Sequence, residues 1–196
     1  MADVKIHKCF PTLVHEFRLN LNHDKMIDYI YNVGEAKGQI HQSPDDLHKY
    51  GMFEPLVNEL DLIHDSILRK LEYKFDKIEI TNMWSNHLYS GDSHPPHTHS
   101  NNFLSGVYYL EAEDGAAPIQ FFDPRPQSNV LRPRNKASWQ NCSMIQFDAI
   151  KGVGYIFPSW LQHWVPPTDG KRISISWNII LRGEYGEPGT LQNANI

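Results

Sequence analysis

Three histidines within a stretch of six residues, His94, His97 and His99, have the spacing of a metal site. In an extended chain residues i and i+2 point to the same side, so the side chains of His97 and His99 should converge. Pro95-Pro96 favours an extended chain, which directs His94 to the opposite side. The pattern therefore favours His97 and His99 as metal ligands and His94 as a residue at the rim of the site. A solvated histidine-rich loop is the alternative interpretation.

Two later segments carry further candidates for chemistry. His163 lies between Trp160 and Trp164, surroundings that suit either a metal ligand in a dry site or a histidine packed on aromatic rings. In the strand expected next, alternation places Arg172 and Ser174 on one polar face. A guanidinium and a hydroxyl two residues apart have the geometry to bind a carboxylate. A polar face turned to solvent is the alternative for this strand.

The elements that position these residues change from helical to β along the chain. Helical spacing of apolar residues predicts one helix after Asn22 and a longer one from Glu54, within a helical part at about 20–75. His64, beside the apolar stripe of the second helix, is interpreted as a packing or surface residue. From about 78 to 182, short β-branched and aromatic segments separated by turns are typical of antiparallel strands. We expect a single domain over residues 1–196, mainly β, with N-terminal helices packed on one sheet.

Composition and charge exclude several classes of protein. A net charge of −5 argues against binding of bulk nucleic acid, which needs clustered lysine and arginine. No apolar run approaches the ~20 residues that span a bilayer, and the first residues lack the apolar segment of a signal peptide. The two cysteines lie far apart and are expected to be free thiols. The sequence therefore predicts a cytoplasmic protein without a membrane partner. Its oligomeric state is left open, with a homodimer as one option.

The order of these pieces resembles the iron(II)- and 2-oxoglutarate-dependent oxygenases. In both, a histidine pair or His-x-acid motif comes early in the β region, a single histidine comes late, and an arginine follows on the next strand. Residues 80 to 181 are similar to a little-characterised group of these oxygenases found in marine bacteria and their phages. The resemblance implies a double-stranded β-helix (a jelly roll, cupin-like), with iron(II), 2-oxoglutarate and dioxygen, and hydroxylation as the outcome. A phage-encoded member would act in the host cytoplasm.

Carried over residue by residue, the resemblance makes His97, His99 and His163 the metal ligands. It makes Arg172, with Ser174 beside it, the anchor for 2-oxoglutarate. His99 stands where the superfamily has an aspartate or glutamate, whereas His-x-His is the usual form in the narrower group. Two further residues could contact the co-substrate because of their positions: Asn86, on the strand before the histidines, and Tyr108, on the strand after them. For both, packing in the core is the alternative.

The sequence leaves the substrate open between a small molecule and a protein side chain. A cupin-like three-histidine metalloenzyme that does not use 2-oxoglutarate is one alternative function, and it would have no use for Arg172 and Ser174 as an anchor. A barrel that binds metal without catalysis is another. Binding of 2-oxoglutarate to the metal-loaded protein separates the three functions.

Overall fold

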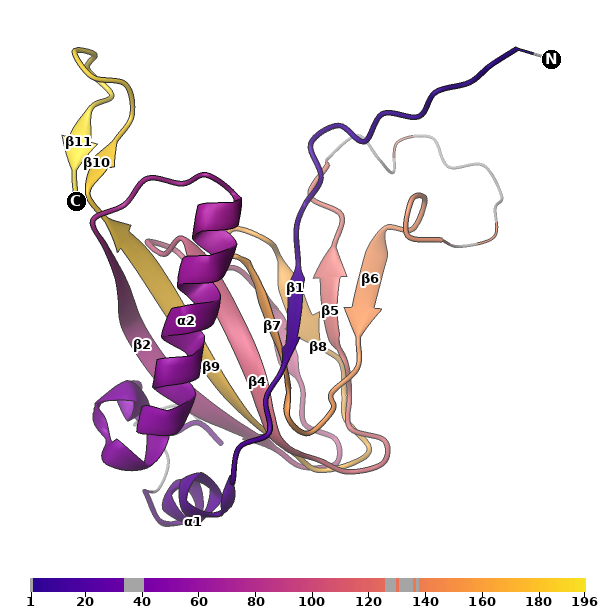
Figure 1. Cartoon of the computed structure of the whole chain (residues 1–196). Coiled ribbons are helices and arrows are strands. Elements are labelled where there is room, and N and C mark those ends of the chain that lie inside the picture. The colour runs from indigo at the N-terminus through magenta and orange to yellow at the C-terminus, as the bar shows by residue number, and fades with distance from the viewer. Residues whose placement is uncertain (1, 34–40, 126–129, 131–135, 137) are drawn as a thin grey trace.

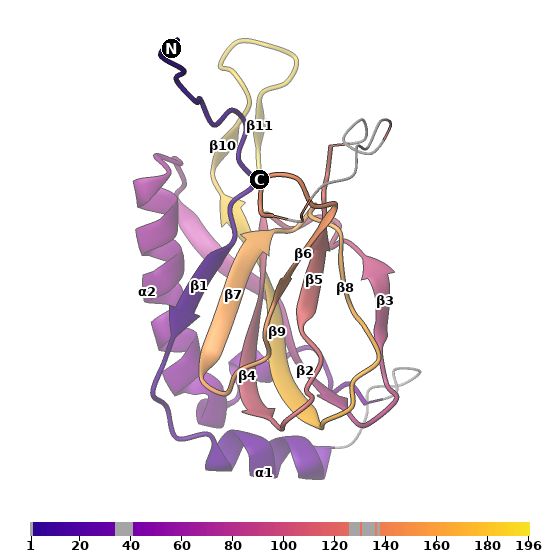
Figure 2. The same ribbon diagram turned by 90° about the vertical axis from the view of Figure 1, so that its right-hand side faces the viewer.

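Two large β-sheets, a two-stranded sheet of β10 and β11, and two α-helices form the computed structural model, which describes residues 2–33, 41–125, 130, 136 and 138–196 (Figures 1 and 2). One large sheet has the strand order β1-β7-β4-β9-β2 and the other β3-β8-β5-β6. All of their strand pairs are antiparallel. The elements are β1 (His15–Arg18), α1 (Asp24–Val33), the 3-10 helices η1 (Leu47–Lys49) and η2 (Gly51–Phe53), α2 (Glu54–Lys70), β2 (Lys77–Leu88), β3 (His94–His97), β4 (Leu104–Ala112), β5 (Ile119–Phe122), β6 (Met144–Phe147), β7 (Val153–Pro158), β8 (His163–Val165), β9 (Arg172–Arg182), β10 (Glu184–Tyr185) and β11 (Ala194–Asn195).

The two predicted helices are confirmed. Asn22 satisfies one free backbone N–H at the start of α1, because its side-chain oxygen accepts the Asp24 N–H at 2.8 Å. Pro55 is tolerated in the first turn of α2, because a backbone N–H at that position would have no acceptor within the helix. Figure 1 shows α2 lying across the face of the larger sheet over β9. Strand β1, which adds an edge to that sheet beside β7, was not predicted from the sequence.

Strand β9 divides the interior into an apolar and a polar side. Its apolar face packs with the helices in the main core and consists of Ile173, Ile175, Trp177 and Ile179. Its other face turns toward a cavity and carries Arg172, Ser174 and Ser176. The sequence left open which face is the interior of the barrel, and the structure shows that it is the polar one. The helices cover the apolar face, and the polar face lines the cavity.

His64 confirms the packing interpretation. It is fully buried on α2, and the indole Nε1 of Trp177 donates a hydrogen bond to its Nε2 at 3.1 Å. Burial lowers the pKa of His64 to about 4, so the ring is neutral in the core. A second apolar cluster fills the space between the two sheets and includes Val107, Tyr109, Phe121, Tyr155 and Phe157.

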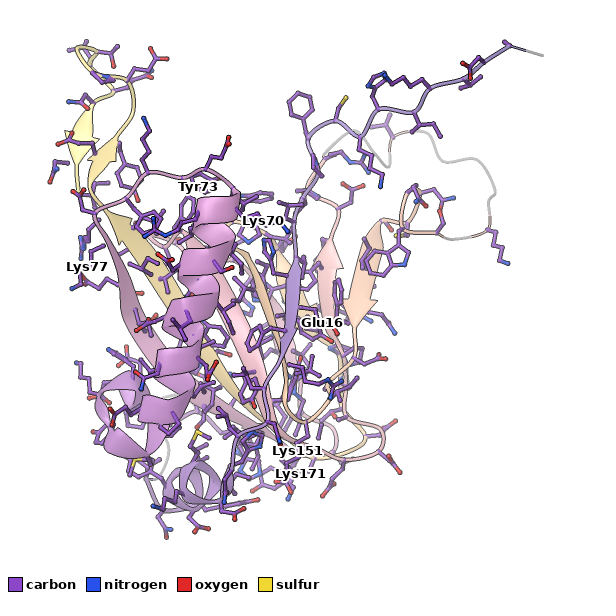
Figure 3. All side chains as sticks on the ribbon, in the orientation of Figure 1. Glu16, Lys70, Tyr73, Lys77, Lys151 and Lys171 are labelled. Carbon is purple, nitrogen blue, oxygen red and sulfur yellow. The ribbon has the colours of Figure 1, made fainter. Side chains whose placement is uncertain are left out.

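Lys171, directly before β9, joins this strand to the helical layer. Its Nζ lies 3.3 Å from the Tyr31 hydroxyl of α1 and 3.2 Å from the Glu111 carboxylate of β4. Figure 3 shows Lys171 toward the end of the molecule where α1 lies. In the described part of the chain, no helix has the length and apolar character needed to cross a membrane. The prediction that residues 1–196 form a single domain stays a prediction.

Candidate active site

Three histidines meet where β3 and β8 pair. His97 ends β3 and His163 begins β8, and the two are cross-strand partners. His99 lies just beyond β3. One ring nitrogen from each of the three lies within 4.8 Å of the others, and the Nε2 atoms of His99 and His163 are 3.3 Å apart. Two imidazole nitrogens bound to one ion at ~2.1 Å and at right angles would be about 3 Å apart. The three side chains therefore fit a single metal ion.

Backbone hydrogen bonds orient two of these rings. The Nδ1 of His97 lies 2.8 Å from the carbonyl oxygen of Pro95, and the Nδ1 of His163 lies 2.9 Å from that of Leu161. Nδ1–H donates in both pairs, because a carbonyl can only accept, and the Nε2 lone pair is left for a metal.

The protonation state of the cluster also suits a metal. Burial lowers the pKa of His99 to about 4 and that of His163 to about 3. Both rings are therefore neutral near pH 7, as metal binding requires. In the described part of the chain, no carboxylate belongs to this group.

His94 lies outside the group of three but lines the same cavity. Its cross-strand partner is Val165 rather than His163. Burial and the nearby charge of Arg172 lower its pKa to about 4. The expectation that His94 points to the opposite side from His97 is wrong, because the register of β3 against β8 shifts between them and both residues line the cavity. A role for His94 at the rim of the site stays a prediction.

Arg172 is a buried cation whose described surroundings provide no counter-ion. It is only 2% exposed. One guanidinium nitrogen donates to the carbonyl of Ala117 at 2.7 Å, whereas its Nε has no hydrogen-bond partner. No described carboxylate forms an ion pair with it. A buried charge left unpaired is costly, and a carboxylate matches the planar guanidinium. Arg172 therefore fits a ligand such as 2-oxoglutarate, which carries carboxylates.

One cavity of about 300 Å³ connects these groups. Its walls come from both sheets and from the segment before η1. Ser174, predicted to stand beside Arg172, is buried in its wall. The lining residues are Gln42, Trp84, Asn86, His94, Pro95, His97, His99, Gly106, Val107, Ile119, Phe157, His163, Val165, Arg172, Ser174 and Ser176.

Asn86 lies in this cavity wall, but most of its hydrogen-bonding capacity is already used. Its Oδ1 accepts from Gln42 Nε2 at 2.7 Å and from Trp84 Nε1 at 3.2 Å, and its Nδ2 donates to Ser176 Oγ at 2.9 Å. One amide N–H remains for a ligand. These bonds also hold the Trp84 ring beside His99, at a centroid distance of 5.9 Å. A contact between Asn86 and the co-substrate stays a prediction.

The structure corrects the expectation for Tyr108. Its side chain points away from the cavity into the helix-side core, where it stacks on Phe17 at 5.9 Å and its hydroxyl lies 2.9 Å from His23 Nε2. The physical reason is the alternation of β4. Tyr108 is the cross-strand partner of Ile175, a residue of the apolar face of β9. Tyr108 therefore does not line the cavity.

The next residue, Tyr109, lies on the opposite face of β4 from Tyr108, beside Arg172. It is the cross-strand partner of Ser174, and its ring lies 4.8 Å from the guanidinium carbon of Arg172. Its hydroxyl is buried, and burial raises its pKa while the neighbouring Arg172 opposes this rise. Tyr109 was not predicted from the sequence. The signal that could have identified Tyr109 is the alternation of β4, because every second residue of this strand lies on the same side as the polar face of β9.

Comparison with known proteins gives a family match over this region. Residues 82–178 match the family described as putative 2OG-Fe(II) oxygenase. The matched segment runs from β2 into β9 and contains the three clustered histidines and Arg172. No curated protein matches the sequence.

Solved structures share the fold at low identity. A prolyl-4-hydroxylase of Pseudomonas putida superposes with a TM-score of 0.62 and 13% identity, covering 88% of this chain and 94% of that chain. The viral collagen prolyl hydroxylase of Paramecium Bursaria Chlorella virus-1 gives 0.57 and 13%, covering 93% and 97%. The alpha-ketoglutarate-dependent epimerase SnoN gives 0.59 and 10%, covering 92% and 81%. The expected double-stranded β-helix, with helices packed on one sheet, is confirmed.

Proposed function

The chain belongs to the 2OG-Fe(II) oxygenases, and from this premise we propose which of its residues bind the metal and the co-substrate. The family makes the protein an oxidoreductase that uses iron(II), 2-oxoglutarate and dioxygen. When bound, the iron lets dioxygen oxidise 2-oxoglutarate to succinate and carbon dioxide and place the second oxygen atom on a substrate. The protein's contribution is to bind, orient and shield these partners.

We propose that His97, His99 and His163 hold the iron. Their ring nitrogens converge, and hydrogen bonds through Nδ1 orient the rings of His97 and His163. Burial keeps His99 and His163 neutral. A three-histidine set carries no negative charge, so the site is one unit more positive than one with a carboxylate ligand. Three ligands leave coordination positions for the co-substrate and dioxygen.

Arg172 binds the distal carboxylate of 2-oxoglutarate in this proposal, with hydroxyl groups from Ser174 and Tyr109 beside it. The observation that carries the assignment is the buried guanidinium without a counter-ion in the same cavity as the three histidines. A cupin-like enzyme that does not use 2-oxoglutarate, or a barrel that binds metal without catalysis, would leave this charge unpaired.

Substrate and location are proposals of a broader kind. We propose a small molecule or a protein side chain as the substrate, and the net charge of −5 argues against bulk nucleic acid. We propose a cytoplasmic location, which the two free cysteines, Cys9 and Cys142, support because free thiols suit a reducing compartment.

Formation of succinate tests the function. Protein loaded with iron(II) is incubated in air with 2-oxoglutarate and ascorbate, the latter as reductant because no substrate takes up the second oxygen atom, and succinate is measured by mass spectrometry. We expect succinate in amounts that match the 2-oxoglutarate consumed, and none above background with chelated metal or with His163→Ala. Equal succinate from the parent and His163→Ala would reject the assignment of the site.

A further inference from the structure

The three proposed ligands are held by two different means. His97 and His163 each donate Nδ1–H to a backbone carbonyl. Within the described residues, no hydrogen bond of this kind anchors the Nδ1 of His99. Instead its backbone N–H donates to the carbonyl of Ser159, in the turn after β7, at 2.9 Å. The position of His99 therefore depends on what fixes that turn.

A chain of buried side-chain hydrogen bonds ends at this turn. Asn178 Nδ2 on β9 donates to Asn82 Oδ1 on β2 at 2.7 Å, and Asn178 Oδ1 accepts from the Ser105 hydroxyl of β4 at 2.6 Å. Ser105 Oγ lies 2.9 Å from Ser159 Oγ. Because the Ser105 hydrogen is used on Asn178, the Ser159 hydroxyl donates to Ser105. The chain thus runs across three neighbouring strands of the larger sheet to the residue that holds His99.

Three members of this chain are as buried as the core, whereas Asn82 at its far end is only partly buried. Ser105 and Ser159 are each 1% exposed, and Asn178 is 2% exposed. Polar groups at such positions cost stability unless all of them are bonded, and a fully bonded network is rigid. Apolar residues would fill the same space at lower cost, so stability alone does not account for this choice of residues.

Backbone hydrogen bonds extend the same connection. The N–H of Ser159 donates to the carbonyl of Phe103 at 3.1 Å, and the N–H of Phe103 donates to that of Ile179 at 2.7 Å. Between His99 and Phe103, Asn101 has a φ of 63°, a left-handed turn conformation that asparagine tolerates well. The loop that carries His99 is therefore fastened both to the turn after β7 and to β9.

We propose that Asn178, Ser105 and Ser159 are positioning residues for the metal site, which act by fixing the backbone that carries His99. The inference rests on the proposed role of His99 as a ligand. It predicts that loss of the central hydroxyl weakens metal binding although every ligand remains.

The test compares Ser105→Ala with Tyr108→Phe. Both variants lose a buried hydroxyl of β4 that is hydrogen-bonded to a side chain, but Tyr108 faces away from the cavity. Two quantities are measured: amide hydrogen exchange of His99 in the metal-free protein, and the affinity for Mn²⁺ by isothermal titration. In Ser105→Ala we expect faster exchange at His99 and an affinity lower by about tenfold, at the low end of the effect of groups that support metal ligands. Tyr108→Phe should match the parent in both.

Ser159→Ala provides a second route if Ser105→Ala does not fold. It should reproduce both effects. The double variant of Ser105→Ala and Ser159→Ala should bind Mn²⁺ only slightly more weakly than either single variant, because both residues act through one chain. Unchanged exchange at His99 in the folded variants would overturn the inference. Faster exchange with parental Mn²⁺ affinity would overturn it as well.

Failure of the proposed function would look different. In that case His99→Ala would bind Mn²⁺ as tightly as the parent. Failure of the positioning chain alone would leave His99→Ala defective and Ser105→Ala normal.

Discussion

His97 and His163 lie opposite each other on the paired strands β3 and β8, with ring centroids 4.4 Å apart. Each ring is hydrogen-bonded through Nδ1 to a carbonyl two residues earlier in its own segment. The pair is therefore oriented by the fold itself, before any metal binds. Residues far apart in the sequence become neighbours because the smaller sheet pairs the two strands.

Removal of His163 or His97 should abolish stoichiometric iron(II) binding. Changes to groups around a ligand typically lower metal affinity by roughly 10- to 100-fold. We expect His163→Ala and His97→Ala to lower it by more, because each removes a ligand itself. His94→Ala is the matched control, because His94 lines the same cavity but lies outside the cluster. Its iron(II) affinity should fall by less than about tenfold. Elemental analysis and circular dichroism of the purified variants measure metal and fold. Full iron occupancy in His163→Ala would refute the assignment.

Arg172 should control the co-substrate without affecting the metal. A charge-assisted hydrogen bond contributes about 1.5–3 kcal/mol, so Arg172→Ala should weaken 2-oxoglutarate binding by roughly tenfold to a hundredfold. Arg172→Lys should recover only part of this, since an ammonium lacks the planar fork. Titrations of both variants loaded with Mn²⁺ check the prediction. Parental affinity for 2-oxoglutarate in Arg172→Ala would place the pocket elsewhere.

Tyr109 should contribute to the same binding event. Loss of one neutral hydrogen bond costs about 0.5–1.5 kcal/mol, so Tyr109→Phe should weaken 2-oxoglutarate binding by about two- to tenfold. Tyr108→Phe should leave it unchanged, because that hydroxyl is bonded to His23 on the other face of β4. A larger loss of 2-oxoglutarate affinity in Tyr108→Phe than in Tyr109→Phe would show that Tyr108, and not Tyr109, lies on the side of β4 that binds the co-substrate.

His99→Asp should preserve the metal site. The carboxylate adds one negative charge beside the cation, so iron(II) should stay bound and turnover should still depend on 2-oxoglutarate. The shorter side chain makes some uncoupled oxidation of 2-oxoglutarate the expected defect. Iron content and the ratio of succinate to 2-oxoglutarate consumed are the measurements. An iron-free His99→Asp protein that is otherwise folded would contradict this prediction.

The buried His64 should make the protein less stable in acid. Its pKa is 6.5 in the unfolded chain and about 4 when buried, so the unfolded state binds the extra proton first as the pH falls. The stability is complete above pH 6.5 and declines between pH 6.5 and 4 by up to about 3 kcal/mol. In His64→Gln, whose amide oxygen can still accept from Trp177, this part of the decline should disappear. Urea unfolding of the metal-free proteins at pH 7.5 and 4.5 measures the difference, and equal slopes against pH would contradict it.

Local patterns predicted most of the elements and the residues of the cluster. The helices followed from apolar spacing and from Asn22 at the start of the first one, and the convergence of His97 and His99 followed from their separation by one residue. The face that β9 turns inward could not be predicted, because it depends on the helices that cover the other side. The choice between Tyr108 and Tyr109 depended in the same way on the register of β4 with β9.

Hydrogen-bonded groups drawn from several strands leave no local pattern in the sequence. Asn178, Ser105 and Ser159 each look like an ordinary polar residue of a strand or turn. Their connection exists only because three strands of one sheet lie side by side. The same holds for the bonds that join Gln42 and Trp84 to Asn86.

The most direct test of the central claim is anaerobic isothermal titration of 2-oxoglutarate into the iron(II)-loaded protein, with the metal-free protein in parallel. The three histidines and Arg172 line one cavity, so the metal and the arginine should bind the same molecule from its two ends. We predict one molecule of 2-oxoglutarate bound per protein, with an affinity that falls sharply when the metal is absent. Absence of binding to the iron-loaded protein, or equal binding with and without iron, would contradict the assignment of this cavity as the active site.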